Sequence, residues 1–257
     1  MRATTIFLTV HKGASTFIAS EFAFSLEKVF PELEVTNLGN EIIAGKSFED
    51  VALRPEGSAI IRMYPQDVDR VVEIPAPSGG RFSDKKIVVL RRDPRDAAIS
   101  LYYSKVFSHS SQVRDPEKLL REREELGEIG VYEGVLQKTA RAAMREFNLM
   151  SDFIDECPWA LVTTYEKLVT DYATWLEGVA EYLGWDIAQT QDLYDRTKVS
   201  FDPPDVEDPN QHKRRITPGN WQEIHTPELQ RLYERLGGER LEQAGYRWDL
   251  QKTGVNQ

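Results

Sequence analysis

Four short apolar runs, most of them rich in β-branched residues, and one weaker run at residues 34–37 alternate along the chain with longer segments of helical character. The runs span residues 4–10, 34–37, 58–63, 86–90 and 159–164. The fourth, KIVVL, has the unbroken apolar core of a strand buried on both faces of a sheet. Strands that alternate with helices form parallel sheets. The sequence therefore predicts a three-layer α/β/α fold around a central, mainly parallel sheet of about five strands.

Segments between these runs carry helix start and stop signals. Asp93 and Pro94 combine an N-cap residue with a first-turn proline, and Gly184 is typical of the position just after a helix. From such signals and from apolar spacing we expect one helix to begin at Asp93 and others to cover residues 16–30, 139–156, 171–183 and 226–243.

Three stretches lie outside this pattern. Residues 76–83 and 200–219 are rich in Pro and Gly and are expected to be loops. The charged residues 114–128 form either a solvated helix or a mobile lid. Because no stretch has the composition of an interdomain linker, we expect one domain over residues 1–257, with 254–257 as a loose tail.

Composition excludes several classes of protein. The chain has 32 Lys and Arg against 42 Asp and Glu, a net charge of −10, whereas proteins that coat nucleic acid carry a basic excess. A small anionic ligand remains compatible, since a few focused cations can hold one. Cys157 is the only cysteine, which favours a reducing compartment. With no apolar segment of membrane-spanning length, we expect a soluble cytoplasmic protein without nucleic-acid or membrane partners.

The turn after the first expected strand, HKGAST at residues 11–16, joins a strand to a helix start. Such a turn can aim backbone N–H groups at a phosphate. Lys12 would add a cation, and Ser15 and Thr16 would add hydroxyl donors. The turn is not a Walker A loop, in which the lysine stands at the end. An ordinary capped strand-to-helix turn is the alternative that these residues leave open.

Two basic segments follow later in the chain. RRDPRD at residues 91–96 comes directly after the buried fourth strand, where an arginine could grip a phosphate with paired N–H donors. A helix cap with surface arginines in ion pairs is the alternative. HKRRITPGNW at residues 212–221 is either a solvated charge run or a loop that closes over an anion.

These three segments, in this order, resemble the sulfotransferases that use 3′-phosphoadenosine 5′-phosphosulfate (PAPS). HKGASTF is similar to their 5′-phosphosulfate loop PKSGTTW, RDPRDAAIS to their 3′-phosphate motif RNPKDxxxS, and RRITPGNW to their late motif RKGxxGDW. TTYEKL and VSFD more weakly resemble YYEDL and TSF. The resemblance extends from residue 4 to about 245. It implies a fold similar to that of P-loop nucleotide hydrolases and in-line transfer of a sulfuryl group from PAPS to a hydroxyl or amine acceptor.

The resemblance also implies roles for individual residues. Lys12, helped by Ser100, would stabilise the leaving phosphate. The 5′-phosphate would be held by the remainder of the loop, namely Gly13, Ala14, Ser15 and Thr16. The 3′-phosphate would be held by Arg92, Ser100, Arg214 and Arg215. The adenine side would be lined by Phe17, Tyr165, Ser200 and Phe201.

The sequence departs from the family motifs at four places. His11 and Ala14 replace a proline and a glycine of the loop, and Ile216 replaces a glycine of the late motif. Residues 60–65 (IIRMYP) stand where soluble members carry KTHLP, whose histidine is the general base. The base is therefore unassigned, and five residues remain as alternatives: His11, His109, Glu41, Glu49 and Asp50.

Cofactors and partners follow from the same resemblance. PAPS is the expected co-substrate and adenosine 3′,5′-bisphosphate (PAP) its product, and no metal is expected because no ligand cluster has suitable spacing. The acceptor is expected to be a small molecule or a glycan, and a homodimer is left open. The missing histidine keeps a non-catalytic PAPS- or PAP-binding protein as the alternative function. A nucleotide kinase is disfavoured, since a Walker A sequence is absent.

Overall fold

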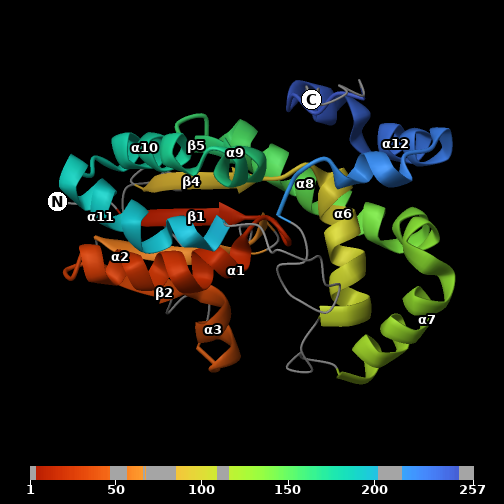
Figure 1. Cartoon of the computed structure of the whole chain (residues 1–257), viewed down its shortest axis with the longest axis horizontal. Helices are drawn as coiled ribbons and strands as arrows, with labels where there is room; N and C mark the ends of the chain where they lie inside the picture. Colours follow the sequence, from red (N-terminus) through yellow and green to blue (C-terminus); the bar gives the residue numbers. More distant parts are fainter. Residues whose placement is uncertain are drawn as a thin grey trace.

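A five-stranded sheet forms the centre of the computed structural model (Figure 1). The structure describes residues 4–46, 57–65, 67, 85–108, 116–201 and 216–248. The strands are β1 (Thr5–Thr9), β2 (Glu34–Asn37), β3 (Ser58–Met63), β4 (Lys86–Arg91) and β5 (Leu161–Thr164). Their order is β2-β3-β1-β4-β5, and every pairing is parallel. The predicted α/β fold with a parallel sheet of about five strands is confirmed.

Helical segments connect the strands. The first runs without interruption through α1 (Ser15–Phe17), a π-helical stretch (Ile18–Phe22) and α2 (Ala23–Val29). The others are α3 (Leu38–Ile43), α6 (Pro94–Tyr103), α7 (Pro116–Gly134), α8 (Ala140–Glu156), α9 (Tyr165–Thr170), α10 (Tyr172–Leu183), α11 (Ile187–Thr197) and α12 (Pro227–Gln243). Shorter 3₁₀ or π turns cover Ser104–Ser108, Val135–Thr139, Lys198–Phe201 and Asn220–Ile224. Within these described segments, no helix is both long and apolar enough to cross a bilayer.

The two faces of the sheet are covered by different helices, which gives the three predicted layers. On one face, Phe7 and Val88 pack against α2, α10 and α11, with Trp175 fully buried among them. On the other face, Ile6 and Val89 contact α3 and α8. Alternating side chains of one strand thus enter opposite cores, as expected for strands buried on both sides.

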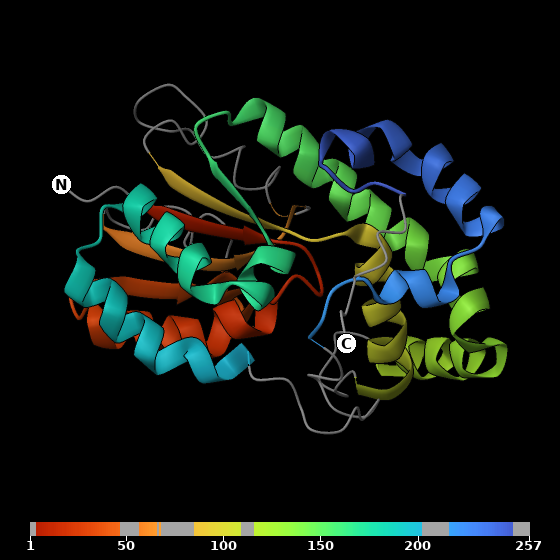
Figure 2. The same ribbon diagram turned by 45° about the horizontal axis from the view of Figure 1, so that its top comes forward.

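A third apolar cluster lies beyond the carboxyl ends of the strands. It is built by α6, α7, α8 and α12 (Figures 1 and 2). Asp93 caps α6 by accepting a hydrogen bond from the backbone N–H of Arg95, at 2.9 Å. The buried strand β4 therefore passes directly from the sheet into this helical cluster. The polar residues that follow β4 lie at the junction.

The predicted helices are present, and residues 116–128 of the charged segment form most of α7, which bends at Gly130 (φ 77°). Gly184 ends α10 in the left-handed conformation, as expected. Three short helices, α3, α9 and α11, were not predicted. A signal existed for α11, because Asp186 and Gln189 form a reciprocal capping box. The expected loop 76–83 lies outside the described residues.

One glycine pair tests this packing. A Cβ at Gly134 would lie 2.5 Å from the buried Tyr102 ring, whereas a Cβ at Gly178, within α10, meets nothing within 4 Å. We expect Gly134→Ala to lower the free energy of unfolding by about 1–3 kcal/mol through overpacking. Gly178→Ala should raise it by about 0.5–1 kcal/mol through helix propensity. Urea unfolding measures both, and equal effects of the two changes would contradict the α6–α7 contact.

Candidate functional site

The turn after β1 is held by short internal hydrogen bonds. The hydroxyl of Thr9 donates to the carbonyl of Gly13 at 2.8 Å, and the Gly13 N–H donates to the carbonyl of Val10 at 3.0 Å. A Cβ at Gly13 would lie only 2.9 Å from the Val10 side chain. Only glycine fits this position, so the sequence HKGAST fixes a tight turn ahead of α1.

Two residues of this turn adopt the left-handed backbone conformation. Lys12 has φ 65° and Ala14 has φ 62°. A glycine would take up this conformation readily, so Ala14 keeps the backbone shape at a cost of about 1–2 kcal/mol. Left-handed residues beside right-handed ones turn successive N–H groups toward a common concave side, which suits an anion.

Arg92 follows β4 and lies against this turn. Its side chain is only 3% exposed, its Nη1 donates to the carbonyl of Lys12, and its guanidinium carbon lies 4.0 Å from the centre of the Tyr165 ring. The Nε and Nη2 atoms are buried and have no hydrogen-bond partner among the described residues. In the part of the chain that the structure describes, no carboxylate forms an ion pair with it. A buried guanidinium of this kind needs a counter-charge.

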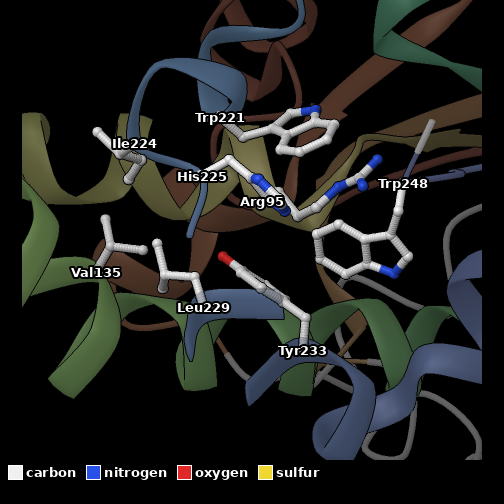
Figure 3. A pocket seen from close by; sticks show the side chains of 8 residues that line it. All are labelled: Arg95, Val135, Trp221, Ile224, His225, Leu229, Tyr233 and Trp248. Atoms are coloured by element: carbon white, nitrogen blue, oxygen red, sulfur yellow. The ribbon is translucent and has the colours of Figure 1, made fainter. Parts of the chain in front are cut away.

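The two neighbouring arginines, Arg91 and Arg95, have other interaction partners. Arg95 forms a buried fork-like pair with Asp93, with N–O distances of 2.6 to 3.1 Å, and its guanidinium lies between Trp221 and Trp248 (Figure 3). Nη2 of Arg91 donates to the carbonyl of Ala244 at 3.1 Å, and its guanidinium carbon lies 5.6 Å from the centre of the Tyr246 ring. The cavity beside Arg95 has a volume of about 10 Å³, room for a single water. Arg92 is therefore the arginine of this segment best suited to an external anion.

The late sequence motif is fastened to the same region. The Asp96 carboxylate accepts hydrogen bonds from the backbone N–H groups of Gly219 at 2.6 Å and Trp221 at 2.9 Å. The Tyr165 hydroxyl donates to the carbonyl of Ile216 at 2.9 Å. Burial raises the pKa of Asp96. The segments after β1, β4 and β5 and the PGNW stretch thus meet at one edge of the sheet.

Glu166 accepts hydrogen bonds that hold the backbone next to Arg92 in place. Its carboxylate accepts from the backbone N–H of Asp93 at 2.9 Å and from the Tyr246 hydroxyl at 3.1 Å. Burial is the main cause that raises the pKa of Glu166. These bonds fix the turn between β4 and α6, and with it the backbone from which Arg92 projects.

Burial also acts on Lys12. Burial, and secondly the positive charge of Arg92, lower the pKa of Lys12 to about 8. Burial and the charge of Arg92 both disfavour the protonated form of Lys12, and a bound dianion would offset the effect of Arg92. Two buried or half-buried cations therefore lie side by side after β1 and β4, and both favour an anionic ligand.

The predicted adenine-side residues lie on the other flank of the turn. The Phe17 ring is 5% exposed, and its centre lies 4.6 Å from that of Phe201 and 6.1 Å from that of Tyr172. Ser200 is buried beside Phe201. The weakly matching segment VSF therefore does meet the start of α1. The role of Phe17 beside adenine stays a prediction.

His11 lies in an arrangement that the sequence did not indicate. Its backbone N–H donates to Glu146 Oε2 at 2.8 Å, and its Nδ1 hydrogen-bonds to Glu146 Oε1. Its ring stacks on Tyr64, with centres 4.0 Å apart and planes inclined by 3°. No sequence signal points to Glu146, which lies 135 residues away in the middle of α8.

The other predicted residues are distributed as follows. Ser15 begins α1, Thr16 is exposed in it, and Ser100 is half-buried on α6. Glu41 lies on α3 and pairs with Lys46. Five predicted residues lie outside the described part of the chain: Glu49, Asp50, His109, Arg214 and Arg215. Among described residues, no group of three or more His, Cys, Asp or Glu could hold a metal ion.

Comparison with known proteins places this site in a family. The sequence model of the sulfotransferase domain matches residues 75–225, more than half of the chain. The chain belongs to the sulfotransferase family. The activity expected from the sequence, PAPS-dependent sulfuryl transfer, is the activity of this family, so that prediction is confirmed at the level of the family. No curated protein sequence matches the chain.

Solved structures of this family share the fold of the chain. A mouse sulfotransferase complexed with PAP is 16% identical, with a TM-score of 0.53, over 95% of this chain and 86% of its own. A retinol dehydratase in complex with androsterone and PAP is 14% identical, with a TM-score of 0.55, over 97% of this chain and 84% of its own. At these identities the comparison supports the architecture and leaves residue roles to the site itself.

The lowered pKa of Lys12 predicts a specific pH dependence. Between pH 8 and 10.5 the unfolded chain binds more protons at Lys12 than the folded protein does, so this lysine destabilises the folded state most below pH 8 and progressively less above it. The difference in free energy of unfolding between wild type and Lys12→Met should therefore favour the variant most at pH 7 and shrink toward pH 10.5. Urea unfolding of both proteins across this range measures it, and a constant difference would contradict the burial of the ammonium group.

Proposed function

We propose that this sulfotransferase binds PAPS at the turn after β1 and the end of β4, and transfers its sulfuryl group to a hydroxyl or amine acceptor. The observation that carries the proposal is the buried Arg92 guanidinium with two unpaired nitrogens. It lies in contact with the turn that matches the 5′-phosphosulfate loop. A ligand with two separate phosphate groups would fit both, with one group at Arg92 and the other at the turn.

Arg92 is the principal ligand of the 3′-phosphate in this proposal. Its free Nε and Nη2 can donate to two phosphate oxygens, as arginine does in charge-assisted pairs. Ser100, on the helix that Arg92 precedes, would add a hydroxyl donor. Arg214 and Arg215 are assigned to the same phosphate on the family motif alone.

The 5′-phosphosulfate end is assigned to the turn itself. Backbone N–H groups of Gly13, Ala14, Ser15 and Thr16, with the two hydroxyls, would hold the 5′-phosphate. On the flank of this turn, Tyr165, Phe17, Ser200 and Phe201 would border the adenine. The Tyr165 hydroxyl is already bonded to Ile216, so its contribution would be its ring and its support of Arg92.

Lys12 supplies the charge that the reaction needs. PAPS provides an activated sulfuryl group whose departure leaves negative charge on a phosphate oxygen. Lys12 projects from the turn that holds this phosphate, and there its ammonium group would stabilise the charge as it develops. A phosphate next to Lys12 would also restore the protonated form that burial and Arg92 disfavour. Positioning and charge stabilisation are then the main sources of catalysis.

The acceptor and the setting of the enzyme are proposed more broadly. The retinol dehydratase of similar fold was crystallised with androsterone, a small hydroxylated molecule, which supports a small-molecule acceptor here. A cytoplasmic location is proposed from the single, buried Cys157. A non-catalytic PAP-binding protein is the alternative, and it would share the Arg92 site while giving no sulfated product.

Ligand-induced stabilisation tests the proposal. We expect PAP to raise the melting temperature of the protein far more than ATP with Mg²⁺ at the same concentration, because only PAP places a phosphate on the 3′ side of the ribose. A thermal melting assay measures both shifts. Equal shifts, or a larger one with ATP, would contradict the proposed donor site.

A matched pair of variants locates the effect. Arg92→Met keeps an unbranched buried side chain and removes the charge, so it should abolish most of the PAP shift. Arg196→Met removes an exposed arginine that pairs with Asp192 on α11 and should leave the shift unchanged. A full PAP shift in Arg92→Met would show that the phosphate site lies elsewhere.

A further inference from the structure

We infer that His11 is the general base of this sulfotransferase, held in position by Glu146 and Tyr64. The inference deepens the proposed function and rests on it. It supplies the group that the sequence lacks, since residues 60–65 contain no histidine.

Glu146 fixes both the backbone and the ring of His11. Its two carboxylate oxygens separately bind the His11 backbone N–H, at 2.8 Å, and Nδ1. A carboxylate cannot donate, so Nδ1 carries the proton in this contact and Nε2 of the neutral ring carries the lone pair. The contact therefore selects the tautomer that a base acting through Nε2 requires.

The ring of His11 is also oriented toward open space. One face is covered by Tyr64, while the side chain as a whole keeps an exposed fraction of 41%. Nδ1 is occupied by Glu146, so Nε2 is the ring nitrogen that remains for an acceptor. No described residue hydrogen-bonds to Nε2, which leaves it accessible to an acceptor hydroxyl.

The location of this ring relative to the donor site is set by the chain. His11 directly precedes Lys12, so their Cα atoms are about 3.8 Å apart. Tyr64 belongs to the segment IIRMYP that stands where soluble family members carry their histidine. The imidazole of His11 thus lies against this segment, reached from the adjacent strand β1.

The proposed step balances as follows. An acceptor hydroxyl oxygen forms a bond to sulfur while the bond from sulfur to the 5′-phosphate oxygen breaks, and that oxygen keeps the electron pair. His11 Nε2 takes the proton of the hydroxyl, and the imidazolium so formed is stabilised by the Glu146 carboxylate. Glu146 acts through His11 and is a positioning residue.

Kinetics with two probe acceptors test the inference. The acceptors are 2-naphthol, a phenol, and 1-hexanol, an aliphatic alcohol, each with labelled PAPS. His11→Asn keeps an amide donor for Glu146 and removes the base, so we expect kcat to fall about 10²–10³-fold with 1-hexanol. The fall should be smaller with 2-naphthol, whose proton is more acidic, and KM for PAPS should be unchanged. Equal rates of wild type and His11→Asn with both acceptors would overturn the inference.

Nitrogen-15 NMR provides a readout that does not depend on turnover. The chain has four histidines, and the His11 signals are assigned with the His11→Asn variant. We expect neutral His11 to carry its proton on Nδ1 in the wild type, with PAP present or absent, and to lose this preference in Glu146→Gln. A proton on Nε2 in the wild type would overturn the inference.

PAP binding distinguishes a failure of the His11 assignment from a failure of the proposed function. If His11→Asn binds PAP as the wild type does and transfers sulfate at the wild-type rate, only the assignment of the base fails. If the wild type itself does not bind PAP, the proposed function fails.

Discussion

A buried arginine organises the functional edge of this protein. Arg92 is nearly inaccessible, yet two of its guanidinium nitrogens have no hydrogen-bond partner among the residues that the structure describes. Taking such a charge out of water costs several kcal/mol unless hydrogen bonds and an opposite charge compensate. Its remaining contacts, the Lys12 carbonyl and the Tyr165 ring, come from the ends of two other strands. The fold thus holds a cation at a position suited to an anion.

The surrounding residues show why this charge remains available. Arg95, three positions on, is neutralised by Asp93 and enclosed by two tryptophans (Figure 3). The nearby carboxylates of Asp96 and Glu166 are committed to backbone N–H groups of Gly219, Trp221 and Asp93. The acids near Arg92 therefore hold loops in place and leave its free N–H groups for a ligand.

Features that depend on residues close together in the chain could be predicted from the sequence. Four of the five strands are short apolar runs, and the caps at Asp93 and Gly184 lie within a few residues of what they cap, so both could be predicted. The order of the motifs identified the family. The same order also indicated which strand ends would meet, since carboxyl ends of parallel strands share one edge.

Contacts between distant segments could not be read in this way. The pairing of His11 with Glu146 joins positions 135 apart, and Glu146 is one of many charged residues on a helix. Without the family motif, Arg91, Arg92 and Arg95 cannot be told apart in the sequence. They differ in the folded chain because each has its own carbonyl or carboxylate partner. The structure also explains Ala14, because its φ of 62° keeps the turn that glycine would form.

A crystal structure of the complex with PAP would show whether Arg92 binds the 3′-phosphate. We expect a 3′-phosphate oxygen to lie about 2.7–2.9 Å from Nε or Nη2 of Arg92. The 5′-phosphate should lie against the backbone N–H groups that follow Lys12. A complex in which Arg92 keeps only its contacts to the Lys12 carbonyl and Tyr165, with the nucleotide bound elsewhere, would contradict the account.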